Sequence, residues 1–179
     1  MEKFLQGESW SFDRHLVILQ RYEIDTLITN LLFDKVSLWV QVHDIPVRYL
    51  NQDVAKKLCE LVDEVNRTPE ILEVEGGSFI RVRVRVDVNL PLCQGYIFSI
   101  EDSREDWVSF NYEHLPNICY WCRRLNHVDR DYDLWIESDG TLEAGDQEYG
   151  PWIHAPFALL HKKPMVVVLV FYAAEKKAS

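Results

Sequence analysis

Cys119, Cys122 and His127 follow the spacing C-x2-C-x4-H, which places three metal-binding side chains within nine residues. Two cysteines separated by two residues point toward one ion from a tight turn, and a histidine five residues later approaches from the other side. Thiolate and imidazole are ligands that zinc takes in structural sites. The pattern therefore predicts zinc as the cofactor and these three side chains as its ligands.

Tyr132 stands where the fourth ligand is expected, because a complete pattern would read C-x2-C-x4-H-x4-C. A phenol is a poor zinc ligand at neutral pH, since its reference pKa is about 10. The carboxylates of Asp131 and Asp133 are alternative oxygen ligands. Arg123 and Asn126 replace the usual flexible glycines, and Asn tolerates a left-handed backbone better than Arg. Two hypotheses stay open: a site with a substituted ligand, and a degenerate motif that binds metal weakly or not at all.

A C-x2-C pair also occurs in redox proteins, but the surrounding sequence does not favour that function. Thioredoxin-type pairs begin a helix after a strand in a βαβ unit, whereas Pro116 precedes this pair and arginines follow it. The chain also has no G-x-S-x-G, P-loop, G-x-G-x-x-G or H-E-x-x-H motif. We therefore expect no enzymatic activity and no small-molecule substrate.

Zinc knuckles bind single-stranded nucleic acid, so basic and aromatic side chains are candidate contacts. The formal net charge is −10, from 19 basic and 29 acidic residues, and phosphate binding must therefore depend on a local patch. Three arginines on one face of a strand would lie about 6.5–7 Å apart, close to the phosphate spacing of an extended single strand. The candidate nucleic-acid-binding residues are Arg81, Arg83, Arg85, Tyr120, Trp121, Arg123, Arg124 and Arg130.

The row Arg81, Arg83 and Arg85 also has a structural interpretation. These side chains would form the solvated face of a half-buried sheet and pair with Glu73, Glu75 or carboxylates of neighbouring strands. Both hypotheses require the same strand, and they differ in whether the guanidinium groups are available to a partner.

An α+β domain is predicted over residues 34–115, as the unit that positions these side chains. Segments rich in β-branched and aromatic residues predict strands, and Gly76-Gly77 predicts a hairpin turn before the arginine-bearing strand. The predicted strands are 37–43, 78–88, 96–100 and 107–112. They indicate a mostly antiparallel sheet with one main helix, followed by a small degenerate zinc-knuckle module at 116–133.

The main helix is predicted from about residue 53 to 62, with Asn51 as its N-cap. Val54, Leu58 and Leu61 are spaced i, i+4, i+7 and form its expected buried stripe. Cys59 lies beside them and is expected to be a small core residue.

Residues 1–33 are predicted to be the remnant of an upstream α+β domain plus a connector, with a strand at 15–22. Residues 134–179 are predicted to be an acidic linker and an unassigned tail, in which 165–172 is a candidate strand. The longest apolar run, 165–174, is about half of the roughly 20 residues that a membrane span needs. With no signal-peptide pattern and four cysteines, we expect no membrane partner and an intracellular location, in the nucleus or cytoplasm.

Several pieces of the chain resemble a plant family of gag-like proteins from non-LTR (LINE-type) retrotransposons, in which a domain of unknown function precedes a C-x2-C-x4-H-x4-C zinc knuckle. The resembling pieces are 7–21, 33–46, 79–88, 91–92, 110–122, 129–131 and 149–152. The resemblance implies binding of zinc and nucleic acid without enzymatic activity. The resemblance implies that Cys119, Cys122 and His127 are zinc ligands. Tyr132, the missing upstream strands and the unmatched tail are typical of a truncated, degenerate copy.

The favoured hypothesis is a non-enzymatic protein of retrotransposon origin that binds RNA or single-stranded DNA. The alternative is an interaction or structural protein, or a decayed copy, that has lost its metal and nucleic-acid binding.

Overall fold

Apolar and polar residues alternate along two paired strands, β3 (Lys35–His43) and β5 (Phe79–Asp87), so that the main sheet has one apolar face. The computed structural model describes residues 9–20, 25, 27–66, 79–100, 104–147 and 149–156. It pairs the two strands antiparallel along their whole length. The core-facing side chains are at most 2% exposed: Val36, Leu38, Val40, Val42, Ile80, Val82, Val84 and Val86. Branched side chains of this kind pack well on a pleated surface, which explains the pairing.

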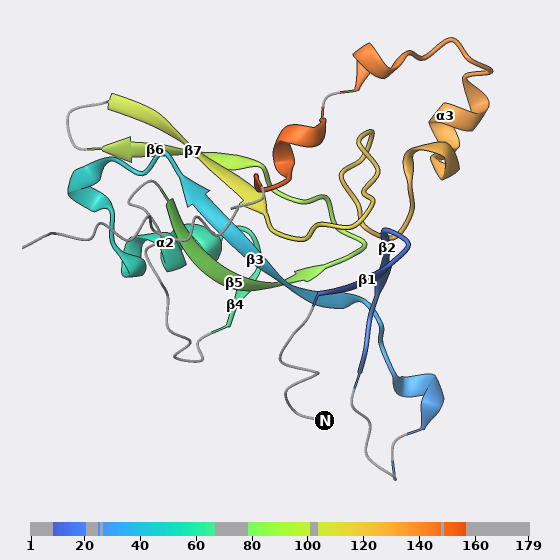
Figure 1. The fold of residues 1–179 in the computed structure, drawn as a ribbon, viewed down its shortest axis with the longest axis horizontal. Helices are drawn as coiled ribbons and strands as arrows, with labels where there is room; N and C mark the ends of the chain where they lie inside the picture. The colour runs from blue at the N-terminus through green and yellow to red at the C-terminus, as the bar shows by residue number, and fades with distance from the viewer. Residues whose placement is uncertain are drawn as a thin grey trace, which may run out of the picture.

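Five described strands form the main sheet in the order β4-β5-β3-β7-β6. The other three strands are β4 (Glu64–Val65), β6 (Gly95–Ile100) and β7 (Arg104–Tyr112), and all neighbours pair antiparallel. The main helix α2 (Gln52–Cys59) lies beside β4 and β5 (Figure 1). The predicted α+β class, a mostly antiparallel sheet with one main helix and a small zinc-knuckle region, is confirmed.

Helix α2 (Gln52–Cys59) begins as predicted, because the Asn51 side chain accepts a hydrogen bond of 3.0 Å from the backbone N–H of Val54. Leu58 and Cys59 are buried in the core, as expected. The helix ends earlier than predicted, and the assignment of Leu61 to its buried stripe is wrong. Leu61 is 51% exposed because the chain turns after Cys59 to enter β4.

The N-terminal segment forms a small hairpin of β1 (Trp10–Phe12) and β2 (His15–Val17). Its turn residues Asp13 and Arg14 have positive φ angles. The strand predicted at 15–22 is thus shorter in the structure, and residues 9–20 contain no helix. After the short 3-10 helix η1 (Ile28–Asn30) the chain enters β3.

The zinc-knuckle segment and the residues after it share the core of the main sheet. Ile118, Leu125 and Ile153 are buried against the same cluster as the strand valines. The backbone N–H of Ala155 donates to the carbonyl of Tyr112 at 2.8 Å, which fixes the chain beside the end of β7. The domain boundaries predicted at 115 and 133 stay a prediction, but the described residues on both sides of each pack in one core.

Outside this core the chain between the knuckle and Ile153 forms short elements with mostly exposed side chains. These elements are η3 (Asp129–Asp131), α3 (Asp133–Glu137), η4 (Ala144–Asp146) and η5 (Pro151–Ile153). A further 3-10 helix, η2 (Val47–Tyr49), precedes α2. Figure 1 shows α3 at the opposite end of the molecule from α2. No helix in the described part of the chain is long and apolar enough to cross a membrane. The predicted turn at Gly76-Gly77 and the candidate strand 165–172 lie outside the described residues.

Replacing Ile153 by alanine tests whether the segment after the acidic stretch belongs to the core. We expect Ile153→Ala to lower the free energy of unfolding by about 2–5 kcal/mol, because it removes a fully buried branched side chain. Urea unfolding followed by tryptophan fluorescence measures the change. Ile136→Ala is the control, since Ile136 is 61% exposed, and its effect should stay within about 0.5 kcal/mol. Equal effects of the two variants would show that Ile153 does not contribute to the core.

Candidate metal centre

The C-x2-C segment folds as a tight turn held by backbone hydrogen bonds. The N–H of Arg123 donates to the carbonyl of Cys119 at 2.7 Å, and the N–H of Cys119 donates to the carbonyl of Arg124 at 3.1 Å. Arg123 adopts a left-handed conformation with φ of 62°. The turn is therefore closed at the position where a glycine is usual, although a larger residue occupies it.

The turn is attached to the segment that follows β5. Leu125 donates its backbone N–H to Val88 at 3.1 Å, and Leu92 donates to Arg123 at 2.9 Å. The side chains of Ile118 and Leu125, on either side of the turn, are buried in the core. The apolar residues on either side of the C-x2-C turn thus fix both ends of the turn to the core.

Three donor atoms meet at this turn. The sulfur atoms of Cys119 and Cys122 and a ring nitrogen of His127 all lie within 4.8 Å of one another. The Cys122 sulfur and His127 Nε2 are 3.3 Å apart. The structure therefore brings together all three side chains that the sequence predicts as zinc ligands.

A neighbouring amide orients the imidazole of His127. The Asn126 side-chain oxygen lies 2.6 Å from His127 Nδ1, and the Asn126 amide nitrogen donates to the side-chain oxygen of Asn89 at 3.1 Å. The second bond fixes which end of the amide faces the histidine. With the amide oxygen facing Nδ1, this arrangement suits the tautomer in which Nδ1–H donates to Asn126 and Nε2 faces Cys122, as in zinc sites where an outer partner orients the ligating ring.

Cys119 has an environment suited to a metal-bound thiolate. Burial raises the pKa of its thiol to about 12, while hydrogen bonds from the backbone N–H groups of Cys122 and Trp121 to the sulfur act to lower that pKa. Without a cation the thiol stays protonated at neutral pH. A bound divalent cation would deprotonate it, and the two N–H donors would then stabilise the negative sulfur. Two sulfurs and one oriented nitrogen fit zinc.

The fourth ligand position is not filled by the predicted alternatives. The donor cluster within the described ranges comprises the three side chains and includes neither Asp131 nor Asp133. Tyr132 stacks on His127, with ring centroids 5.9 Å apart and planes 6° apart. The described chain therefore offers three ligands.

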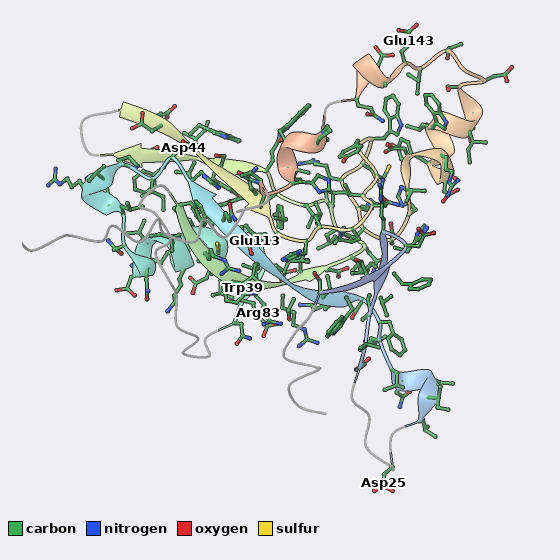
Figure 2. The ribbon with its side chains drawn as sticks, in the orientation of Figure 1. Asp25, Trp39, Asp44, Arg83, Glu113 and Glu143 are labelled. Atoms are coloured by element: carbon green, nitrogen blue, oxygen red, sulfur yellow. The ribbon has the colours of Figure 1, made fainter. Side chains whose placement is uncertain are left out.

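The arginine row on β5 divides between internal contacts and the surface. Arg81 forms an ion pair with Glu113 at 2.6 Å and lies over the ring of Trp39 at 4.6 Å. Arg83 is only 9% exposed and lies 5.7 Å from the same ring, whereas Arg85 is exposed. Figure 2 shows Trp39, Arg83 and Glu113 in one region of the sheet.

The structural interpretation of this row thus applies to Arg81, but its partner is Glu113. Glu113 was missed because it follows β7 and reaches Arg81 across β3, a pairing that no local sequence signal reports. Glu73 and Glu75 lie outside the described residues.

The candidate nucleic-acid contacts near the metal motif fall into two groups. Three make internal contacts: the Tyr120 hydroxyl lies 2.9 Å from His154 Nε2, Trp121 stacks on Trp135 at 5.6 Å, and Arg123 lies 4.0 Å over the ring of Tyr149. Arg124 and Arg130 are exposed.

A cleft of about 780 Å³ lies next to the metal motif, between the β1–β2 hairpin and the chain around η3. Tyr120 and Arg130 line it together with Arg14 from the hairpin turn and His154 from the segment after η5. Burial lowers the pKa of His154, so its imidazole is neutral at pH 7. Arg14 and His154 are far from the motif in sequence, and no spacing rule could have joined them to it.

Comparison with known proteins supports the metal-binding interpretation of this segment. Residues 86–134 match the family model described as Zinc knuckle. An Arabidopsis thaliana protein named Uncharacterized protein At4g02000 is 28% identical over 132 residues, which cover 69% of this chain and 39% of that protein. The chain thus spans about two fifths of the length of this relative. No solved structure matches the chain.

Removing the amide that orients His127 tests the metal centre. We expect Asn126→Ala to weaken zinc binding about 10–100-fold, because outer-shell partners that fix a ligating histidine have effects of this size. Competition with a chromogenic chelator measures the affinity. Arg124→Ala is the control, since its exposed side chain lies outside the donor cluster, and it should leave the affinity unchanged. An unchanged affinity in Asn126→Ala would show that the contact does not support a ligand.

Proposed function

We propose that this chain is a non-enzymatic protein of retrotransposon origin that binds zinc through a knuckle-like turn and binds RNA or single-stranded DNA. The observation that carries the proposal is the convergence of Cys119, Cys122 and His127 within a segment that matches a zinc-knuckle family. Zinc knuckles are modules that recognise single-stranded nucleic acid. The proposed origin rests on the resemblance of the chain to gag-like proteins of plant retrotransposons.

Cys119, Cys122 and His127 would hold the ion, and the bound zinc would fix the turn as a structural cross-link. The turn lies on the sheet through Leu125 and Leu92, so fixing it also fixes the backbone that carries Arg123 and Arg124. The proposed role of the metal is to hold a basic surface in one shape. The lack of a recognisable catalytic motif supports a binding function in this portion of the chain.

The contact surface that we propose lies around the turn and its adjoining cleft. Arg124 and Arg130 are exposed, and Arg130 shares the cleft with Arg14 and the aromatic ring of Tyr120. Exposed guanidinium groups neutralise phosphates, and an aromatic ring beside them offers a face on which a base stacks. The row on β5 contributes less to this surface, because Arg81 already has a carboxylate partner.

The salt dependence of binding tests the proposed surface. We expect the double variant Arg124→Ala and Arg130→Ala to bind a labelled single-stranded oligonucleotide more weakly than the native zinc-loaded protein. The slope of log affinity against log salt should fall in magnitude by about 1.4, since each lost phosphate contact removes about 0.7 on single strands. Fluorescence anisotropy at several salt concentrations measures both quantities.

The charge-matched control removes Arg48 and Lys57, which are exposed on η2 and α2. It should leave affinity and slope close to native, and equal losses in both double variants would indicate attraction without a defined surface. If zinc-loaded native protein does not bind at low salt, nucleic-acid binding is wrong, and an interaction or structural function remains.

The variant Cys119→Ser tests the proposed binding of zinc. Cys119 is the fully buried donor, so we expect its replacement to reduce the zinc content of purified protein from about one equivalent toward zero. Atomic absorption measures the content. Cys59→Ser is the control, because Cys59 lies in the core outside the donor cluster and should leave the zinc content unchanged. A native protein purified in the presence of zinc without bound metal would contradict the zinc proposal.

A further inference from the structure

We propose that the metal centre is an open three-ligand site whose fourth coordination position takes an exchangeable ligand from solution. The ligand class is water or a small soft or borderline donor, such as imidazole or a thiolate. The inference rests on the proposed zinc binding and concerns what completes the coordination. A site of this kind differs from a four-ligand structural site, in which the protein closes all positions.

The arrangement of Tyr132 is the first support. An imidazole binds a metal through the lone pair of Nε2, which lies in the plane of the ring. Tyr132 stacks on the face of His127 instead, with the two planes only 6° apart. Tyr132 therefore supports the orientation of the imidazole without completing the coordination.

The neighbouring carboxylates provide the second support. Asp131 and Asp133 are exposed and lie outside the donor cluster. Asp129 is closer in the fold to the turn, but its side chain accepts a hydrogen bond from the backbone N–H of Tyr120. That bond engages one carboxylate oxygen at the start of the C-x2-C turn, and Asp129 lies outside the donor cluster of the described residues.

Access from solvent is the third support. Cys119 is fully buried, whereas Cys122 and His127 are partly exposed. Two of the three donor residues therefore border solvent, and we place the fourth coordination position on that side. A small ligand can enter there without displacing any of the three protein donors.

Cobalt(II) in place of zinc tests this proposal, because its d–d absorption reports the coordination number and its sulfur-to-cobalt charge-transfer bands report the thiolates. We expect native protein to bind one cobalt with two thiolates. Titration with imidazole, in a phosphine reductant so that no added thiol competes, should shift the d–d bands with a stoichiometry of one. If imidazole leaves the d–d bands of the cobalt complex unchanged, the open site is wrong, whereas the proposed zinc binding stands.

Two replacements of Tyr132 sharpen the result. Tyr132→Phe keeps the ring beside His127 without the hydroxyl, and it should reproduce the native spectrum and the imidazole response. Tyr132→Cys supplies a third thiolate, so the charge-transfer intensity should rise by about half, the metal affinity should increase, and the imidazole response should disappear. A changed spectrum in Tyr132→Phe would identify the phenol oxygen as the fourth ligand and overturn the proposal.

Light scattering on the cobalt-loaded protein distinguishes two sources of the fourth ligand: the solution and a second copy of the chain. The proposal expects the same molar mass with and without metal. A dimer that forms only on metal loading would assign the fourth position to a second copy and overturn the proposal. Failure of the native protein to bind cobalt or zinc would contradict both the proposed zinc binding and the open site.

Discussion

Two backbone hydrogen bonds attach the metal motif to the segment that leaves the main sheet after β5. Leu125 donates to Val88 and Leu92 donates to Arg123, so the turn is paired with the chain that leaves β5. The buried side chains of Ile118 and Leu125 add apolar contact on either side of the motif. A short metal-binding loop is ordinarily organised by its ion, because few residues lie between its ligands. Here the attachment to the fold already brings the three donors within reach of one another. Metal binding therefore needs to order less of the chain.

This attachment also explains why Arg123 occupies a backbone conformation that is unfavourable for its side chain. Arg123 has a left-handed φ of 62°, a conformation that is unfavourable for a residue with a long side chain by roughly 1–2 kcal/mol. Its guanidinium lies 4.0 Å over the ring of Tyr149, and its Nη1 donates to the carbonyl of Leu92 at 3.5 Å. A glycine would remove the strain but lose both contacts. The arginine thus connects the turn to the segment that packs after the acidic stretch, which a flexible knuckle loop would not do.

The sequence was a good guide wherever a local pattern determines the structure. Alternating branched residues located β3 and β5, Asn51 located the start of α2, and the cysteine spacing located the donor cluster. Apart from the end of α2 and the exposed Leu61, the misses concern long-range contacts. Nothing near Arg81 indicates that Glu113 reaches it across β3, and nothing near Ile153 indicates that it is buried. Contacts of this kind depend on strand order, which a residue-by-residue pattern does not contain.

The number of thiolate ligands would set the charge of the proposed metal centre, and that charge matters in an acidic chain. A zinc ion held by two thiolates and a neutral imidazole has no net charge, whereas a third thiolate in place of Tyr132 would make it −1. In a chain with a net charge of −10, phosphate attraction depends on a few exposed groups such as Arg124 and Arg130. A negative centre beside them would oppose that attraction over the Debye length of about 10 Å at 0.1 M salt. In the proposed zinc-loaded state, Tyr132 in place of a third thiolate would therefore keep the centre neutral beside these basic side chains.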